Sequence, residues 1–327
     1  MNTAMNFLVA AVLAGTPLLF GTLGEILTEK SGNLNLGVEG MMFMGGVAGL
    51  AGSYYYELAA QTPSGLVSAL IALVCAFLCA AFGALLYSVL TVTLRANQNV
   101  TGLALTIFGT GFGNFVGEAI GSRNPSRYMA VGSATKAAFN RGIPGLSDLP
   151  AAGKLLFSYN FMVYLAIAVA VALGIFLNRS RKGLNLRAVG ESPATADAAG
   201  INVTRYKYLA TCIGGGISGL GGLYIVMNAS NGVGGVWVHN CISGRGWIAV
   251  ALVIFATWNS GRAILGALIF GALSVMRFYV PLGIPDQIYN IFPYFATILV
   301  LIAVSMRRKR ENQPPASLGL AYFREER

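Results

Sequence analysis

The sequence predicts an all-α membrane protein, a polytopic bundle of about nine spanning helices, with roughly eight to ten as the range of the span count. Hydrophobic residues make up 55% of the 327 residues and charged residues only 10%. A soluble domain carries about 25% charged residues, so this chain has too little polar surface for a water-soluble enzyme or a disordered protein. Long uncharged stretches alternate with short basic ones, and no alternation of about ten residues recurs as in a β-barrel.

The spans follow from stretches of roughly 20 mostly apolar residues. The first lacks a basic leader and a small-residue cleavage site, so we expect a retained helix and no signal peptide. Two shorter stretches near the C-terminus are separated only by Arg262 and the turn-like residues 259–261. The predicted spans are 7–28, 39–58, 66–94, 97–118, 158–178, 207–228, 246–259, 263–281 and 287–306.

The distribution of basic residues predicts the orientation, because cytoplasmic loops are enriched in Lys and Arg. The loop 179–206 and the tail 307–327 are the most basic segments. Placing both in the cytoplasm puts the N-terminus outside, the C-terminus inside and the loop 119–157 outside, where we expect irregular chain with one short helix. The net charge of +10 is then a topological signal, and no nucleic-acid partner is expected.

Two glycine-rich polar segments, 29–40 and 228–247, interrupt the apolar pattern. Non-helical backbone within a membrane persists only where protein or water covers it, and such interruptions in both halves of a transporter point to a substrate path. The alternative is that both are ordinary loops with tight glycine turns.

Five polar residues of these segments are candidates for the path or its gate: Asn33, Asn35, Glu39, Ser243 and Arg245. Glu39 also suits the positive end of the helix it begins, which is a sufficient structural reason for it. The run Ser243 to Gly246 could start a helix whose N-terminus meets polar groups of a substrate, or Arg245 could be an interfacial side chain that extends to water.

Few residues of the sequence are candidates for a metal site, a cofactor site, catalysis or ATP binding. His239, the single histidine, has no neighbouring Cys or acidic cluster in the sequence, so we expect no metal site, no cofactor and no catalytic residue. A charge such as Glu25 within a span must face protein, water or the membrane edge. The chain has no G-x-x-x-x-G-K-[ST] loop, so it does not bind ATP by that motif.

A short helix is predicted in the cytoplasmic loop over residues 193–199. Ser192 is a suitable N-cap, Pro193 fits the first helical position, and Gly200 follows the last turn. Such a small-residue helix between two spans could dock into a groove of another protein, or it could be a solvated surface turn.

Three sequence blocks carry a resemblance to a known family: Ser31 to Met42 (SGNLNLGVEGMM), Leu186 to Ile201 and Ser243 to Asn259. The chain resembles permease subunits of ABC importers of the nucleoside and simple-sugar family, related to the branched-chain amino acid and ribose permeases. The asparagine-rich form of the first block is more similar to the nucleoside branch, since the sugar branch is usually acidic at the second asparagine.

The resemblance implies a multi-pass permease domain over 1–306 in the inner (plasma) membrane. Such a permease pairs with a second permease, which is homologous or identical. Cytoplasmic ABC ATPase subunits hydrolyse ATP, so the permease itself is not expected to be an enzyme. An extracytoplasmic binding protein delivers a small-molecule solute. It makes Leu186–Ile201 the coupling segment, with candidate ATPase-coupling residues Arg187, Glu191, Pro193, Ala196, Asp197 and Gly200. The alternatives left open are a permease for simple sugars or other ring compounds and an ion-coupled secondary transporter, which typically needs intramembrane carboxylates.

Overall fold

The computed structural model describes residues 3–125, 127–140, 142, 157–228, 234–280, 285–306 and 313–323. The regular secondary structure in this part of the chain is helical, apart from an isolated β-bridge between Ala130 and Val236. The elements are α1 (Thr3–Glu29), α2 (Val38–Ala59), α3 (Gly65–Ser88), the π-helix η1 (Val89–Thr93), α4 (Gln98–Gly121), α5 (Ser133–Asn140), α7 (Phe161–Arg179), α8 (Arg181–Glu191), α9 (Pro193–Ala198), α10 (Val203–Met227), α11 (Arg245–Phe255), α12 (Ser260–Val275), the 3-10 helix η3 (Met276–Phe278) and α13 (Asp286–Met306).

Six of the described helical stretches are long and apolar enough to cross a membrane, so the chain is a multi-pass membrane protein. They are α1, α3 with η1, α4, α7, α10, and α12 with η3. Each of the other three expected spans also contains a helix: α2, α11 and α13. α11 has only 11 residues, and an apolar helical stretch of α13 covers Ile291–Val300. The count of nine spans remains a prediction.

Asparagine caps begin α4, α7 and α10. The side-chain oxygens of Asn97, Asn160 and Asn202 accept hydrogen bonds from backbone N–H groups three residues on, at 3.1, 3.2 and 2.9 Å. An N-cap satisfies one of the amides that the first helical turn leaves free. These caps therefore set where α4, α7 and α10 begin.

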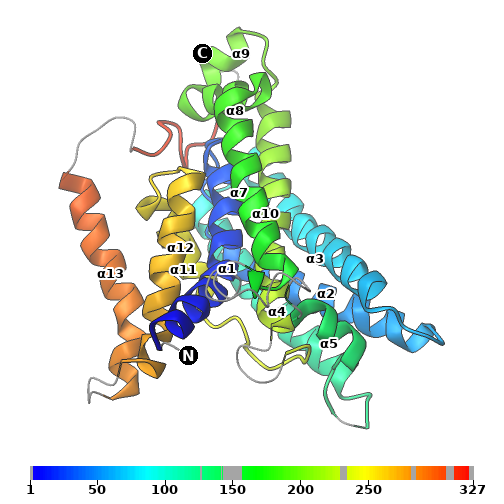
Figure 1. The fold of residues 1–327 in the computed structure, drawn as a ribbon. Helices are drawn as coiled ribbons and strands as arrows, with labels where there is room; N and C mark the ends of the chain where they lie inside the picture. The colour runs from blue at the N-terminus through cyan, green and yellow to red at the C-terminus, as the bar shows by residue number, and fades with distance from the viewer. Residues whose placement is uncertain are drawn as a thin grey trace.

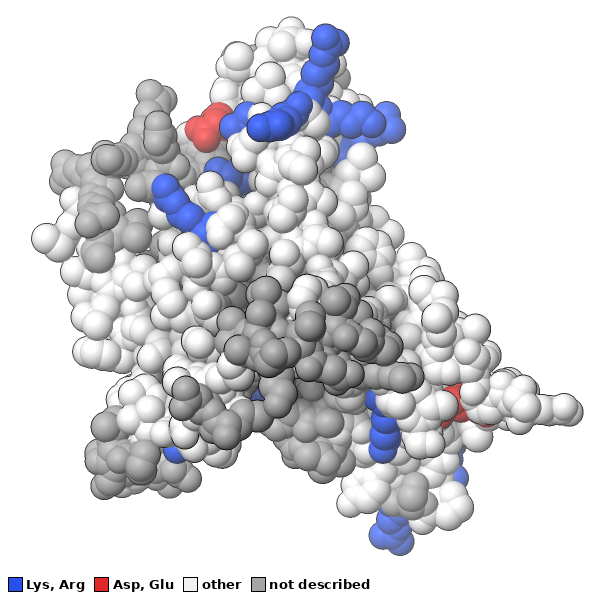
Figure 2. Space-filling view, viewed as in Figure 1, with Lys and Arg blue, Asp and Glu red and all other residues white. Residues whose placement is uncertain are grey.

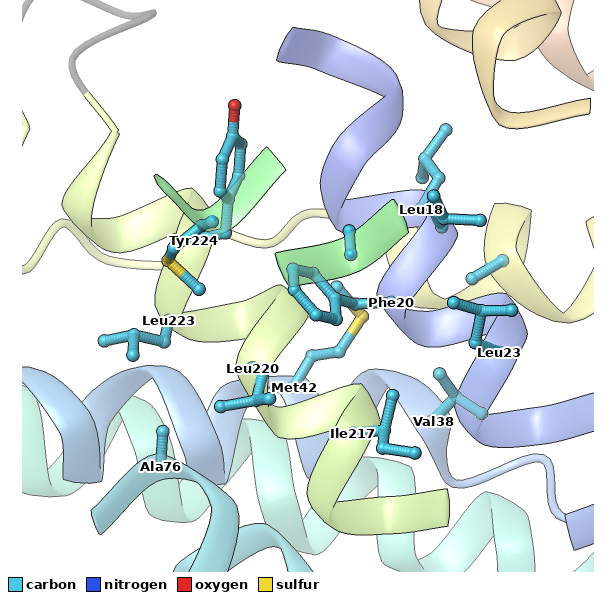
Figure 3. Packing of buried hydrophobic residues seen from close by; sticks show 14 of the residues in the cluster. Leu18, Phe20, Leu23, Val38, Met42, Ala76, Ile217, Leu220, Leu223 and Tyr224 are labelled. Carbon is cyan, nitrogen blue, oxygen red and sulfur yellow. The ribbon is translucent and has the colours of Figure 1, made fainter. Parts of the chain in front are cut away.

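The packed interior is centred on α10, which contacts α1, α2 and α3. Phe20 of α1, Met42 of α2 and Leu220 of α10 belong to one cluster of buried side chains (Figure 3). The backbones approach closely at Gly222, where an added Cβ would lie 1.8 Å from the Met42 carbonyl oxygen. Helices in lipid associate through such packing because the surrounding acyl chains are as apolar as the side chains.

The two ends of the bundle differ. In Figure 1, α8, α9 and the last described residues lie at one end, while α5 and the N-terminus lie at the opposite end. Figure 2 shows Lys and Arg side chains gathered over the end with α8 and α9. This is the end that the basic-residue pattern assigns to the cytoplasm.

The structure adds three features to the expected elements. Helix α8 precedes the expected short helix, and α3 ends in one π-helical turn. Helix α11 ends at Phe255, earlier than expected, and Asn259 accepts from the Gly261 and Arg262 amides to start α12. A π-turn and an Asx cap are local hydrogen-bond choices that an apolar pattern does not encode.

Candidate functional site

Residues 30–37, which we call the first interrupted segment, connect α1 to α2 within the polar stretch 29–40. Their own polar side chains hold them in place. Asn33 is fully buried, and its amide nitrogen donates to Thr211 Oγ1 of α10 at 3.1 Å. The backbone N–H of Asn35 donates to Glu25 Oε1 at 3.0 Å, and its side-chain oxygen accepts from Gly37 N at 2.9 Å. Both asparagines therefore fix the loop between the helices. The buried Asn33 Oδ1 has no hydrogen-bond partner in the described chain.

Glu39 joins the two interrupted segments. It lies in the first turn of α2, and its two carboxylate oxygens accept from Gly244 N and Gly246 N, each at 2.6 Å. Those amides form the N-terminus of α11, where a negative charge is favoured. The group that meets this helix N-terminus in the structure is thus a carboxylate of the same chain.

Arg245 and Ser243 lie at the same junction. Ser243 is exposed with a positive φ of 45°, and Gly244 follows at 81°. The Arg245 guanidinium is half-buried and donates to the Cys241 carbonyl at 2.9 Å. Among the five candidate path residues, these two reach the surface, while Asn33, Asn35 and Glu39 are buried.

A buried contact that the sequence does not reveal lies at the C-terminal end of α1. Glu29 is 3% exposed and accepts a hydrogen bond from the indole nitrogen of Trp258, which lies in the turn between α11 and α12. Glu25, one helical turn earlier, is also buried. Protein, water and the membrane edge are the three surroundings expected for Glu25, and Oε1 contacts protein, while Oε2 has no partner in the described chain. The pairing of Glu29 with Trp258 spans 229 residues, so no local pattern signals it.

The short helix predicted over residues 193–199 is confirmed as α9, which covers Pro193–Ala198. Ser192 Oγ accepts from Thr195 N at 3.4 Å, Pro193 occupies the first turn, and Gly200 has a φ of 81° past the last turn. Ala196 is 3% exposed and packs against Val189 and Val203, so it faces inward. The surface of α9 that remains open is formed by Ala194, Thr195 and Ala198.

The other coupling candidates lie beside the first interrupted segment. An added Cβ on Gly190 of α8 would lie 2.4 Å from the Lys30 carbonyl oxygen. Burial lowers the pKa of the Lys30 ammonium, and the Glu191 carboxylate opposes this shift while the Arg187 guanidinium adds to it. The buried Arg187 Nε has no hydrogen-bond partner in the described chain. α8 is thus seated directly on the loop that carries Asn33 and Asn35.

Residues 313–323, which we call the C-terminal strap, bind across this end of the protein. Ser317 N donates to the Gly190 carbonyl at 3.1 Å, and Tyr322 OH donates to Asp197 Oδ2 at 2.9 Å. Gly319 N donates to the Gly32 carbonyl at 3.3 Å. The strap therefore joins α8, α9 and the first interrupted segment. The rest of the predicted tail 307–327 lies outside the described residues.

The strap also contacts the start of α4. Gln98 Nε2 donates to the Leu320 carbonyl at 3.3 Å, and its Oε1 accepts from Leu34 N at 2.7 Å. The Arg95 guanidinium lies 4.6 Å from the centroid of the Phe323 ring. A cation over an aromatic face contributes about 0.5–1 kcal/mol at an exposed site.

The second interrupted segment closes the opposite end. Residues 229–233 lie outside the described chain. Trp237 is 3% exposed, stands edge-on to Phe43 at 6.4 Å between ring centroids and donates its backbone N–H to the Met129 carbonyl. His239 contacts the Glu118 carboxylate at the surface. This segment therefore packs over α2 and α4 at Trp237, while residues 238–240 are exposed.

These features define a polytopic helical membrane protein with buried polar breaks in its spans and a short exposed helix at its basic end. Residues 7–301 match the family model described as branched-chain amino acid transport system / permease component, and the chain belongs to this family. It is an ABC transporter permease of the nucleoside and sugar transport group.

Curated relatives agree over nearly the whole chain. The putative glucose ABC transporter permease protein TsgC13 of Haloferax volcanii is 33% identical over 99% of both chains. The guanosine ABC transporter permease protein NupQ of Bacillus subtilis is 31% identical over 99% of this chain and 98% of its own. The nucleoside ABC transporter permease protein NupC of Lactococcus lactis subsp. cremoris is 31% identical over 92% of both. Further permeases of these organisms match more weakly, such as the guanosine permease NupP at 26% identity over 44% of this chain and 40% of its own. No solved structure matches the chain at a significant level.

Proposed function

We propose that the chain is the permease subunit of an ABC importer and forms the path for a nucleoside or a related small polar solute by alternating access. The observation that carries the proposal is α9, a two-turn helix at the basic end whose outer face is made of small side chains. Such a helix can enter a groove of a cytoplasmic ATPase and transmit its closure. The chain itself lacks an ATP-binding loop, so the energy must come from that partner.

The contacts around α9 supply a mechanical route to the path. A displacement of α9 would move Tyr322 through its hydrogen bond to Asp197, and it would move α8, which is joined to α9 at Ser192. Through Gly190 of α8 and through the strap, the same displacement would reach residues 30–37. Those residues hold Asn33 and Asn35, and the segment leads into Glu39 and the N-terminus of α11. We infer that Asn33, Asn35, Glu39, Ser243 and Arg245 shape the gate, and that solute and ATPase each bind the two states with different affinity.

A nucleoside is favoured over a sugar by the first sequence block and by the relatives NupQ and NupC, whose names give guanosine and nucleosides. A simple sugar is the second candidate because TsgC13, a putative glucose permease, is similar over the same length. Partners in either case are two ATPase subunits, a binding protein and a second permease. The paired relatives NupQ and NupP of one organism support a homologous partner over an identical one.

The proposal is tested by uptake in proteoliposomes that contain the permease pair and its ATPases. Purified binding protein is first screened with nucleosides, bases, sugars and flavins by thermal shift, and the stabilising compound is then used as labelled solute. We expect saturable nucleoside uptake that needs ATP and persists when a proton ionophore collapses the proton gradient. Uptake that follows the proton gradient without ATP would instead establish an ion-coupled transporter.

The orientation in the membrane has a direct test. Single cysteines at Ser133 of α5 and Thr195 of α9, both exposed, are introduced into a cysteine-free chain in the inner membrane of a host cell. A membrane-impermeant maleimide should label position 133 in intact cells and position 195 only after permeabilisation. The reverse result would invert the topology and contradict the placement of the N-terminus outside.

A further inference from the structure

A groove of about 720 Å³ opens at the end of the molecule that carries α9. It lies between the last turn of η1 with Arg95, the connection from α9 into α10, and Tyr322 of the C-terminal strap. None of the candidate path residues lines it. Its position beside the ends of two spanning helices, α10 and α3 with η1, places it at the level where lipid headgroups meet water.

Lys207 is the most informative residue in this groove. It lines the groove, yet it is only 3% exposed, and no described carboxylate forms an ion pair with it. A buried ammonium without a counter-charge is costly, because its lost hydration is not replaced. A negative group bound in the groove would supply that counter-charge.

The surrounding groups favour an anion with several oxygens. Arg205 and Arg95 line the same groove, and Arg95 is positioned by its stacking on Phe323. Thr204 adds a hydroxyl, and the N-terminus of α10 adds the positive end of a helix. Asp197 also lines the groove, and its Oδ2 accepts from Tyr322 OH. Three basic side chains against one acidic side chain leave the groove positive, and arrays of this kind bind phosphate oxygens.

Apolar side chains next to the groove indicate where the rest of the ligand lies. Leu94, between Thr93 and Arg95, is 66% exposed, Leu90 on η1 is 43% exposed, and Leu209 on α10 is 51% exposed. Leu90 and Leu209 belong to membrane-spanning stretches and Leu94 directly follows one, so they offer a surface to acyl chains. Basic pockets between spanning helices on the cytoplasmic side are suited to acidic lipid headgroups.

We propose that this groove binds the phosphate-bearing headgroup of an anionic phospholipid through Lys207, Arg205 and Arg95, with the acyl chains against Leu90, Leu94 and Leu209. The site is separate from the candidate path residues, and it borders the candidate coupling helix through Asp197 and Gly200. A soluble phosphate ester shares the headgroup chemistry but has nothing to place on the leucines, and this difference separates the two sources.

The test uses the full-length chain purified in detergent, with lipid retention measured by native mass spectrometry and thermal stability measured alongside. Phosphatidylglycerol should bind saturably and raise the midpoint of unfolding, whereas phosphatidylcholine should not. Lys207→Met, which keeps the side-chain length without the charge, should weaken phosphatidylglycerol binding about fivefold or more. Lys207→Arg should retain it. Arg181→Gln removes one charge from exposed α8 at the same end, outside the groove, and should leave binding unchanged.

Three outcomes would overturn the proposal. Equal weakening by Lys207→Met and Arg181→Gln would reduce the effect to general surface charge. Displacement of the lipid by millimolar inorganic phosphate or glycerol phosphate, with no preference for phosphatidylglycerol, would make the groove a site for a soluble phosphate. Failure of any phosphate-bearing ligand to stabilise the wild-type chain over Lys207→Met would remove the anion site altogether. As a control for folding, the midpoint of thermal unfolding of every variant is also measured without added lipid.

Discussion

Glu39 and Gly246 lie 207 residues apart in the chain, and Glu39 Oε2 accepts the Gly246 N–H at 2.6 Å. Together with the bond from Gly244, this contact makes a side chain of α2 the cap of α11. The first interrupted segment cannot move far without moving the second. We therefore regard this carboxylate as the joint between the two halves of the predicted gate.

Replacing Glu39 by Gln should weaken that joint. The amide keeps one acceptor oxygen, but its NH2 group faces a backbone N–H and the charge at the helix N-terminus is lost. Hydrogen bonds to a charged group contribute about 1.5–3 kcal/mol, so we expect a loss of that order in stability and a lower unfolding midpoint in detergent. Glu118→Gln is the control, since Glu118 is 58% exposed and its contact with His239 lies at the surface. Equal midpoints for the two variants would show that Glu39 is dispensable for the packing of α11.

The close approach of α10 to α2 makes Gly222 irreplaceable. A methyl group at Gly222 would overlap the Met42 carbonyl oxygen, so Gly222→Ala should force the helices apart and cost about 1–3 kcal/mol. Gly111 of α4 has open space at its Cβ position. Gly111→Ala should therefore be neutral or stabilise by about 0.5–1 kcal/mol. The folded yield and the unfolding midpoint of both variants measure this, and a stable Gly222→Ala chain would contradict the packing.

The outer face of α9 should be sensitive to bulk without a loss of folding. Ala198→Arg places a long side chain on the exposed face, and we expect uptake and solute-stimulated ATP hydrolysis in the assembled transporter to fall about tenfold, equivalent to roughly 1.4 kcal/mol of lost association. Ala134→Arg on α5, at the opposite end, is the matched control and should transport normally. Ala196→Arg differs from both because Ala196 is buried, so it should lower the folded yield. Unchanged activity of Ala198→Arg would mean that this face does not meet the ATPase.

The C-terminal strap should hold α9 in place through Tyr322. Tyr322→Phe removes the hydroxyl that bonds Asp197 at 2.9 Å but keeps the ring that packs at Val189, Ala196 and Val203. Loss of one such bond costs about 1 kcal/mol, which should raise amide hydrogen exchange across residues 193–203 about fivefold. Tyr55→Phe, a change at an exposed ring of α2 near the other end, should leave exchange in that peptide unaltered. Identical exchange in both variants would exclude a restraining role for the hydroxyl.

Much of the architecture followed from the sequence. Apolar stretches predicted a helix in each expected span, and Ser192, Pro193 and Gly200 predicted α9, because these signals are local. The sequence blocks predicted the permease family, which the family match confirms. Helix α8, the π-turn after α3 and the early end of α11 were missed because each depends on packing or on a single backbone hydrogen bond. The prediction of Asn33, Asn35 and Glu39 identified polar side chains in the breaks without revealing their partners.

By itself, the sequence determined that this protein lies in a membrane, that its basic residues gather at one end and that it belongs to the ABC permeases. Composition and the positions of the basic residues suffice for the first two conclusions, since the cost of burying charge in lipid depends on residue type alone. The family follows from the resemblance of three sequence blocks, which the family match confirms. Only the tertiary structure decided that Glu39 caps α11, that Trp258 bonds Glu29, that Ala196 faces inward and that the strap covers α8 and α9. Each of these contacts joins residues that are distant in the chain or depends on which face a short helix turns to its neighbours, and only the packing of the whole bundle decides this.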